Sequence, residues 1–143
     1  MTSWSGWLKA IRQAMTTKRV DPKEAKALVD QGWTYVDVRT EGEFETGHPA
    51  GSINIPLNSP DFLAVMKAHF KPDARLVVGC QLGGRSARAC ALLENNGYQQ
   101  LADQTGGWGG QRDGLGRVVV PGWLDSQLPV GGGKRFKDVL GNK

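Results

Sequence analysis

The sequence predicts an α/β protein with a mainly parallel central sheet of about five strands and helices on both faces. Two patterns lead to this expectation. Short apolar runs typical of buried strands alternate along the chain with segments of helical periodicity, and several helical segments begin at capping residues and end at glycine. A length of 143 residues is also within the usual size of one domain with an ordinary core. Strands separated by helices generally pair in parallel, which leaves the helices to cover the sheet.

The first half of the chain carries the clearest start signal. Asp21-Pro22-Lys23-Glu24 combines an N-cap residue, a proline at the first helical position and a capping-box glutamate, and Gly32 ends the helix. The elements expected next are a strand over residues 33–38, one or two helical turns over 41–46 and a strand over 52–56. Asp37 and Arg39 then fall at the carboxyl end of the first of these strands.

The second half repeats the alternation. Ser59-Pro60-Asp61 predicts the N-cap of a helix that runs to Phe70. The elements expected after it are a strand over residues 75–79, a helix over 87–95 that Gly97 closes, and a weaker strand over 98–104. Further on, Val118-Val119-Val120 indicates an edge strand or an extended segment.

The expected domain spans residues 19–130 and is flanked by two segments of different character. Residues 1–18 form an N-terminal extension in which Leu8, Ile11 and Met15 have the spacing of a short amphipathic helix. Residues 131–143 begin with three glycines and continue as a basic segment, which predicts a flexible tail. The alternatives are a basic arm that binds an acidic protein acceptor and docking of Phe136, Val139 and Leu140 as a final helix.

Charge and composition exclude several classes of partner. The net charge is +4, but the last ten residues alone carry +3, so the rest of the chain is nearly neutral and has no basic stripe for nucleic acid. No apolar stretch approaches the length of a membrane span. The two cysteines, Cys80 and Cys90, have neither a disulfide framework nor a metal-ligand spacing, so we expect no metal, no cofactor and a reducing, cytoplasmic location.

The stretch from Cys80 to Ser86 is the candidate site for chemistry. It lies between an apolar strand and a helix, where α/β sheets bind ligands, and its two glycines allow successive N–H groups to converge at the helix start. Such a cradle suits an anion, and the Cys80 thiolate is one. A buried, inert thiol is the alternative for Cys80, whereas Cys90 lies within an apolar helix and is expected to pack rather than react.

Four motifs follow one another along the chain. They are Val36-Asp37-Val38-Arg39 with Glu43-Phe44, the run from Gly47 to Pro56, the C-x4-R-S loop that begins at Cys80, and Gly106-Gly107-Trp108. In this order they resemble the rhodanese family of sulfurtransferases. The resemblance covers roughly residues 21–112. It implies that Cys80 takes the outer sulfur of a donor such as thiosulfate as a persulfide and passes it to cyanide, a thiol or a protein acceptor.

The resemblance also implies roles for individual residues. Cys80 is the nucleophile, and the backbone N–H groups of the loop bind the charged sulfur; the loop residues are Gln81, Leu82, Gly83, Gly84, Arg85 and Ser86. Arg85 steadies either the loop or the donor anion, and Ser86 either hydrogen-bonds the cysteine or opens the helix. Asp37 and Arg39 are expected to hold the loop in shape, and His48 is expected to be structural.

Two other functions compete with sulfur transfer. Cysteine phosphatases and arsenate reductases also combine a cysteine, backbone amides and an arginine. However, related phosphatase loops hold five residues between cysteine and arginine, against four between Cys80 and Arg85, and have histidine where Gly79 stands. The second alternative is a non-catalytic rhodanese-like binding module. Since Gln81 and Leu82 are uncharged, the donor could also be a persulfide or mercaptan less charged than thiosulfate.

Overall fold

A five-stranded, wholly parallel sheet forms the centre of the protein in the computed structural model, which describes residues 17–141. The strand order is β1-β5-β4-β2-β3, so β4 is central. The strands are β1 (Lys18–Val20), β2 (Thr34–Asp37), β3 (Ile53–Asn54), β4 (Arg75–Gly79) and β5 (Gln100–Gln104). The predicted fold class is confirmed, and four of the strands fall within ranges expected from the sequence.

Strand β1 was not predicted. The short helix expected within the N-terminal extension, residues 1–18, lies outside the described residues except at its end, where Lys18 begins β1. Only Val20 is buried among the three residues of this strand, so no periodicity marks it in the sequence. Pairing with β5, with Lys18 opposite Ala102 and Arg19 opposite Asp103, creates the strand.

The helices of the described chain are α2 (Pro22–Asp30), α3 (Glu41–Thr46), α4 (Phe62–His69), α5 (Gly84–Asn95) and α6 (Phe136–Gly141). The first four were predicted, whereas α6 lies in the segment expected to be a flexible tail. The capping box of α2 is confirmed, because the Glu24 N–H donates to Asp21 at 2.8 Å and the Asp21 N–H donates to Glu24 at 2.9 Å. The side-chain cap expected for α4 is wrong: Asp61 caps no N–H, and its own N–H donates to Ser59 Oγ.

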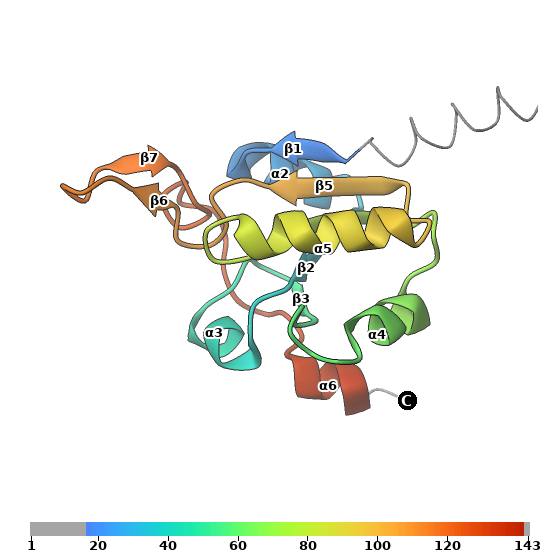
Figure 1. Cartoon of the computed structure of the whole chain (residues 1–143). Helices are drawn as coiled ribbons and strands as arrows, with labels where there is room; N and C mark the ends of the chain where they lie inside the picture. The colour runs from blue at the N-terminus through green and yellow to red at the C-terminus, as the bar shows by residue number, and fades with distance from the viewer. Residues whose placement is uncertain (1–16, 142–143) are drawn as a thin grey trace, which may run out of the picture.

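Alternation of side chains along β4 divides the core into two layers. Leu76 and Val78 face one side, where the buried residues of α4, α5 and α6 pack, and Val77 faces the other, with Ala25 of α2 and Trp123. Figure 1 shows α5 and α2 on opposite sides of the sheet. Among residues 17–141, no helix has both the length and the apolar character needed to cross a membrane.

A β-hairpin stands apart from the main sheet. Strands β6 (Gln111–Arg112) and β7 (Val118–Val120) pair antiparallel and project from the body on the side toward which β5 points (Figure 1). The strand expected at residues 118–120 therefore forms, but in a separate two-stranded sheet.

The flexible basic tail expected over residues 131–143 is a wrong prediction as far as residue 141. Val139 of α6 is 2% exposed and lies in the main core cluster, and Phe136 packs against that cluster. The glycines before α6 are also held: the Gly131 N–H donates to the His48 carbonyl at 2.9 Å, and a Cβ at Gly133 would lie 2.2 Å from the Ser52 carbonyl oxygen. Close backbone contact, rather than flexibility, thus requires glycine at position 133.

Candidate active site

Cys80 directly follows β4, the central strand, at the edge of the sheet where parallel strands present their carboxyl ends. Cys80 is 3% exposed. The Gly83 N–H donates to Cys80 Sγ at 3.1 Å and the Ser86 N–H donates at 3.3 Å. Because α5 begins at Gly84, three residues earlier than expected, Ser86 lies in its first turn and the positive end of the helix faces the sulfur. A negative charge on Sγ is stabilised by this arrangement.

The segment after β5 hydrogen-bonds to backbone carbonyls on the outer side of the cysteine loop. The carbonyl of Cys80 accepts from the Trp108 N–H at 2.7 Å, and that of Gln81 accepts from the Gly109 N–H at 3.0 Å. The Leu82 carbonyl accepts from Gln111 Nε2 at 2.9 Å. Since C=O and N–H of one trans peptide point in opposite directions, fixing the Leu82 carbonyl outward directs the Gly83 N–H inward to Sγ.

Gly107 allows that segment to approach the loop. A Cβ at this position would lie 2.3 Å from the Cys80 carbonyl oxygen, and the backbone has φ +56°. Only glycine meets both conditions without strain. The glycine pair that the sequence analysis noted as a motif therefore serves the cysteine loop.

Asp37 and Arg39 form a buried ion pair beside the loop, and each is 1% exposed. Arg39 Nη2 lies 2.7 Å from Asp37 Oδ2, and Arg39 Nη1 donates to Gln81 Oε1 at 3.2 Å. The guanidinium also donates to the Gly47 carbonyl and lies 5.3 Å from the ring centroid of Trp108. This pair thus contacts three of the segments that surround the site and does not contact Cys80 Sγ.

Arg85 is engaged by a residue that the sequence analysis gave no role in the site. Its Nη1 and Nη2 donate to the two carboxylate oxygens of Glu43, on α3, at 2.8 and 2.9 Å. These hydrogen bonds, with a smaller contribution from Thr40, lower the pKa of Glu43 from 4.5 to about 2. The bidentate pair joins the first turn of α5 to α3.

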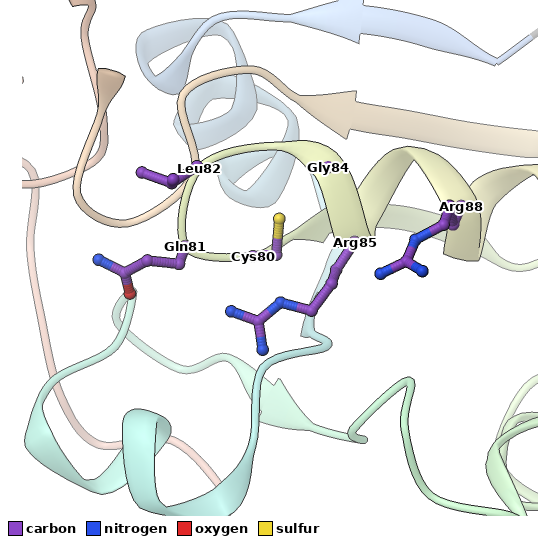
Figure 2. A pocket seen from close by; sticks show the side chains of 6 residues that line it. All are labelled: Cys80, Gln81, Leu82, Gly84, Arg85 and Arg88. Carbon is purple, nitrogen blue, oxygen red and sulfur yellow. The ribbon is translucent and has the colours of Figure 1, made fainter. Parts of the chain in front are cut away.

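A pocket of about 570 Å³ opens over the loop. Figure 2 shows its lining residues, Cys80, Gln81, Leu82, Gly84, Arg85 and Arg88, with the Cys80 sulfur inside the curve of the loop. Leu82 is 52% exposed at the mouth of this pocket. Arg88, which the sequence analysis did not select, extends beside Arg85 and forms no ion pair with any residue from 17 to 141.

Two positions for Ser86 were left open by the sequence, and the structure combines them. Ser86 lies in the first turn of α5, and its hydroxyl is 3.6 Å from Cys80 Sγ. The same hydroxyl donates to Asp103 Oδ1 at 2.6 Å. Asp103 was not among the site residues predicted from the sequence. The available signal was its place as a single carboxylate after the apolar pair Leu101-Ala102 at the end of a strand, a position similar to that of Asp37.

Cys90 and His48 have structural surroundings. Cys90 is 3% exposed on α5, and burial raises the pKa of its thiol well above the ordinary range. The Gly133 N–H donates to His48 Nε2 at 3.1 Å, so Nδ1 carries the proton and donates to the Phe44 carbonyl at 2.8 Å. The structural role expected for each of these residues agrees with these contacts.

Fold and site together define an α/β protein with a cysteine loop between the central strand and a helix. The rhodanese-like domain model matches residues 21–111, and the chain belongs to this family. The crystal structure of Rv0390 from M. tuberculosis superposes with a TM-score of 0.70 at 21% identity, covering 80% of this chain and 97% of that one, which supports the shared fold.

Two plant proteins illustrate the range of the relatives. Thiosulfate sulfurtransferase 18 of Arabidopsis thaliana is 34% identical over 78% of this chain and 81% of its own length. Protein HIGH ARSENIC CONTENT 1, mitochondrial, of the same plant is 39% identical over 62% of this chain. The chain spans 58% of the length of this second relative.

Proposed function

We propose that the protein is a sulfurtransferase that carries sulfane sulfur on Cys80. The Cys80 thiolate attacks the outer sulfur of a donor such as thiosulfate; a new S–S bond forms, the old one breaks, and sulfite leaves with the electron pair. A thiolate or cyanide then attacks the outer sulfur, and the electron pair of the S–S bond returns to Cys80. The observation that supports this most directly is the pair of N–H groups, of Gly83 and Ser86, that donate to Cys80 Sγ at the floor of a pocket.

Arg85 and Arg88 have different roles in this proposal. Arg85 is already paired with Glu43, so its role is to fix the start of α5 against α3. Arg88 lines the same pocket without an ion pair among the described residues and supplies the positive charge that an anionic donor meets. The loop amides bind the transferred sulfur, and the pair of Asp37 and Arg39 supports the loop from behind.

Intact mass after incubation with thiosulfate tests this function. We expect a gain of one sulfur, about 32 Da, that is lost on reaction with cyanide. Cys80→Ser should abolish the gain, and Cys90→Ser is the matched control that should keep it. An adduct that survives in Cys80→Ser would assign the nucleophile to another residue, and no adduct in the unmodified chain would favour a binding module.

Arsenate reduction is a second candidate, supported by the loop chemistry and by the name of the relative HIGH ARSENIC CONTENT 1. The reaction would convert arsenate and two thiols to arsenite, a disulfide and water. The four-residue spacing between Cys80 and Arg85 and the engagement of Arg85 by Glu43 favour sulfur transfer. Arsenite formation in the presence of a thiol, measured beside sulfur transfer, separates the two.

We also propose a cytoplasmic location, because thiols are kept reduced in the cytoplasm. Both cysteines of the chain are free. Fractionation of cells that express the protein tests this, since a relative bears the word mitochondrial in its name.

A further inference from the structure

The two N–H donors to Cys80 Sγ are held in different ways. The Ser86 N–H, at 3.3 Å from the sulfur, lies in the first turn of α5, so helical backbone geometry sets its direction. The Gly83 N–H, at 3.1 Å, precedes the helix and shares a peptide group with the Leu82 carbonyl. The loop itself must therefore set the direction of this second donor.

Packing around Gly83 does not fix that peptide. The residue has φ +121°, and the atoms nearest to a Cβ built there would lie 3.8 and 3.9 Å away. Glycine accepts either sign of φ, so half a turn of the Leu82–Gly83 peptide is sterically open. Such a turn would present the Leu82 carbonyl oxygen to the sulfur, and the negative end of that dipole would repel a thiolate. A specific contact is thus needed to hold the peptide in its observed direction.

That contact comes from a side chain of the β6–β7 hairpin. Gln111 Nε2 donates to the Leu82 carbonyl at 2.9 Å, and within the described part of the chain no other hydrogen bond reaches this carbonyl. The carbonyls of Cys80 and Gln81 differ, because they accept from backbone N–H groups that any sequence would supply. At position 111, by contrast, the type of side chain decides whether a donor is present.

The backbone that carries Gln111 is itself held in place. Gln111 opens β6 and pairs with Val120 of β7. The next residue, Arg112, places Nη2 2.6 Å from Asp125 Oδ1. Figure 1 shows the hairpin on the side of the molecule where α5 begins, which agrees with the contact to the cysteine loop. The Gln111 amide therefore reaches the loop from a fixed position.

We propose that Gln111 is a positioning residue for Cys80. Its amide holds the Leu82 carbonyl outward and thereby keeps the Gly83 N–H directed at Sγ. Gln111 acts through the Leu82–Gly83 peptide and does not itself touch the sulfur. The hairpin, which adds no strand to the main sheet, thus contributes to the stabilisation of negative charge on Sγ. This inference rests on the proposed role of Cys80 as a nucleophile, but its test does not require sulfur transfer.

The chain offers a matched pair of substitutions. Gln111→Met removes the amide donor and nearly preserves the length of an exposed side chain, so the fold should persist. Gln100→Met is the control: Gln100 is also exposed, and its Nε2 donates to the Asp73 carbonyl at 2.8 Å, at the opposite end of the sheet from Cys80. Both changes are made in the Cys90→Ser background, where Cys80 is the sole cysteine.

Amide resonances in NMR spectra recorded across a pH range test the direction of the peptide. Ionisation of Cys80 should shift the resonances of both Gly83 and Ser86, since both N–H groups donate to the sulfur. In Gln111→Met the response of Gly83 should be lost while that of Ser86 remains, and Gln100→Met should keep both. An unchanged Gly83 response in Gln111→Met would overturn the proposal.

Other charged or titratable groups around the loop do not confuse this comparison. They are Tyr35, Asp37, Arg39, Arg85, Arg88 and Asp103. All are identical in the three proteins, so a difference confined to Gln111→Met reports the loss of the amide.

Alkylation of Cys80 by iodoacetamide gives a second measurement, because the thiolate is the reactive form. We expect Gln111→Met to react about tenfold more slowly near neutral pH, equivalent to one pH unit, and to match the parent protein at high pH where the thiol is fully ionised. Slower reaction at every pH would assign the effect to access and refute the proposal. If thiosulfate adds no mass while both measurements behave as expected, the proposed function fails and the role of Gln111 stands.

Discussion

Cys80 and Cys90 show how the surroundings of a residue decide its chemistry. Both are 3% exposed and free. Cys80 Sγ accepts two N–H hydrogen bonds at the start of α5, whereas Cys90 lies further along the same helix in apolar surroundings that raise its pKa. Burial alone disfavours a thiolate, and backbone donors at one position only make the two sulfurs unequal.

Glu43 gives a prediction about acid stability. Its pKa is lowered to about 2, chiefly by Arg85, so the pair contributes stability fully above pH 4.5, the ordinary value, and loses it as the pH falls toward 2. Glu43→Gln should therefore lower the urea unfolding midpoint near neutral pH, and the difference from the unmodified protein should shrink as the solution is acidified. Unfolding curves at a series of pH values measure this.

The partner residue provides the control for Glu43. Arg85→Gln removes the same ion pair, so combining it with Glu43→Gln should cost less than the sum of the two single changes. If Glu43→Gln showed the same pH dependence of stability as the unmodified protein, the proposed contribution of the Glu43–Arg85 ion pair would be wrong.

At the scale of elements, the site depends on two connections rather than one. The turn between β4 and α5 carries the cysteine and its N–H donors, and the segment after β5 binds the outward carbonyls of that turn. Neither would form the cradle alone, because a free loop could point its carbonyls at the sulfur. The contact from Gln111 also ties the start of the β6–β7 hairpin to the cysteine loop.

Loop length gives a prediction at this scale. One glycine inserted between Gly83 and Gly84 would separate the two N–H donors to Cys80 Sγ, and loss of one preorganised donor typically costs about a hundredfold in rate. We expect sulfur transfer to fall by about that factor while the fold persists, since Ala89, Cys90 and Leu93 still anchor α5. Turnover with thiosulfate and circular dichroism measure the two effects.

A matched insertion tests whether any added residue would have the same effect. A glycine between Gly114 and Leu115 lengthens the exposed tip of the hairpin, far from the sulfur, and should leave turnover unchanged. Unimpaired transfer by the Gly83–Gly84 insertion would show that the spacing of the donors does not control the reaction.

At the scale of the whole molecule, the described ends of the chain complete the domain. Strand β1 pairs with β5 at one edge of the sheet. At the other edge, the Asn54 N–H of β3 donates to the Lys134 carbonyl at 2.8 Å, and α6 follows to pack on the core. The segment beyond residue 130 therefore belongs to the folded unit through residue 141.

Val139 provides the test of this packing. Val139→Ala removes a buried part of the core and should lower the free energy of unfolding by about 2 kcal/mol. Leu140→Ala is the matched control, since Leu140 is 47% exposed on the same helix and its loss should have little effect. Equal, negligible effects in urea unfolding would mean that α6 does not dock.

Local patterns were sufficient for most of the fold. The capping box at Asp21 and Glu24 fixes a helix start through neighbours three residues apart, and the run from Leu76 to Gly79 marks a buried strand by composition. The prediction failed for two segments with weak sequence patterns. Strand β1 has a single buried residue, and the three glycines before α6 resembled a flexible linker. These segments depend on partners distant in sequence, which periodicity does not report.

The sequence by itself determined the family-like order of motifs, the candidate nucleophile Cys80 and the loop that surrounds it, because strand, turn and helix start are consecutive in the chain. Only the tertiary structure decided which charges meet there. Glu43 and Arg85 are 42 positions apart, and Ser86 and Asp103 are 17 apart. Parallel packing brings the ends of β2, β4 and β5 to one edge, and this proximity, rather than any local pattern, pairs Arg85 with a carboxylate and aligns Asp103 with Ser86 and Cys80.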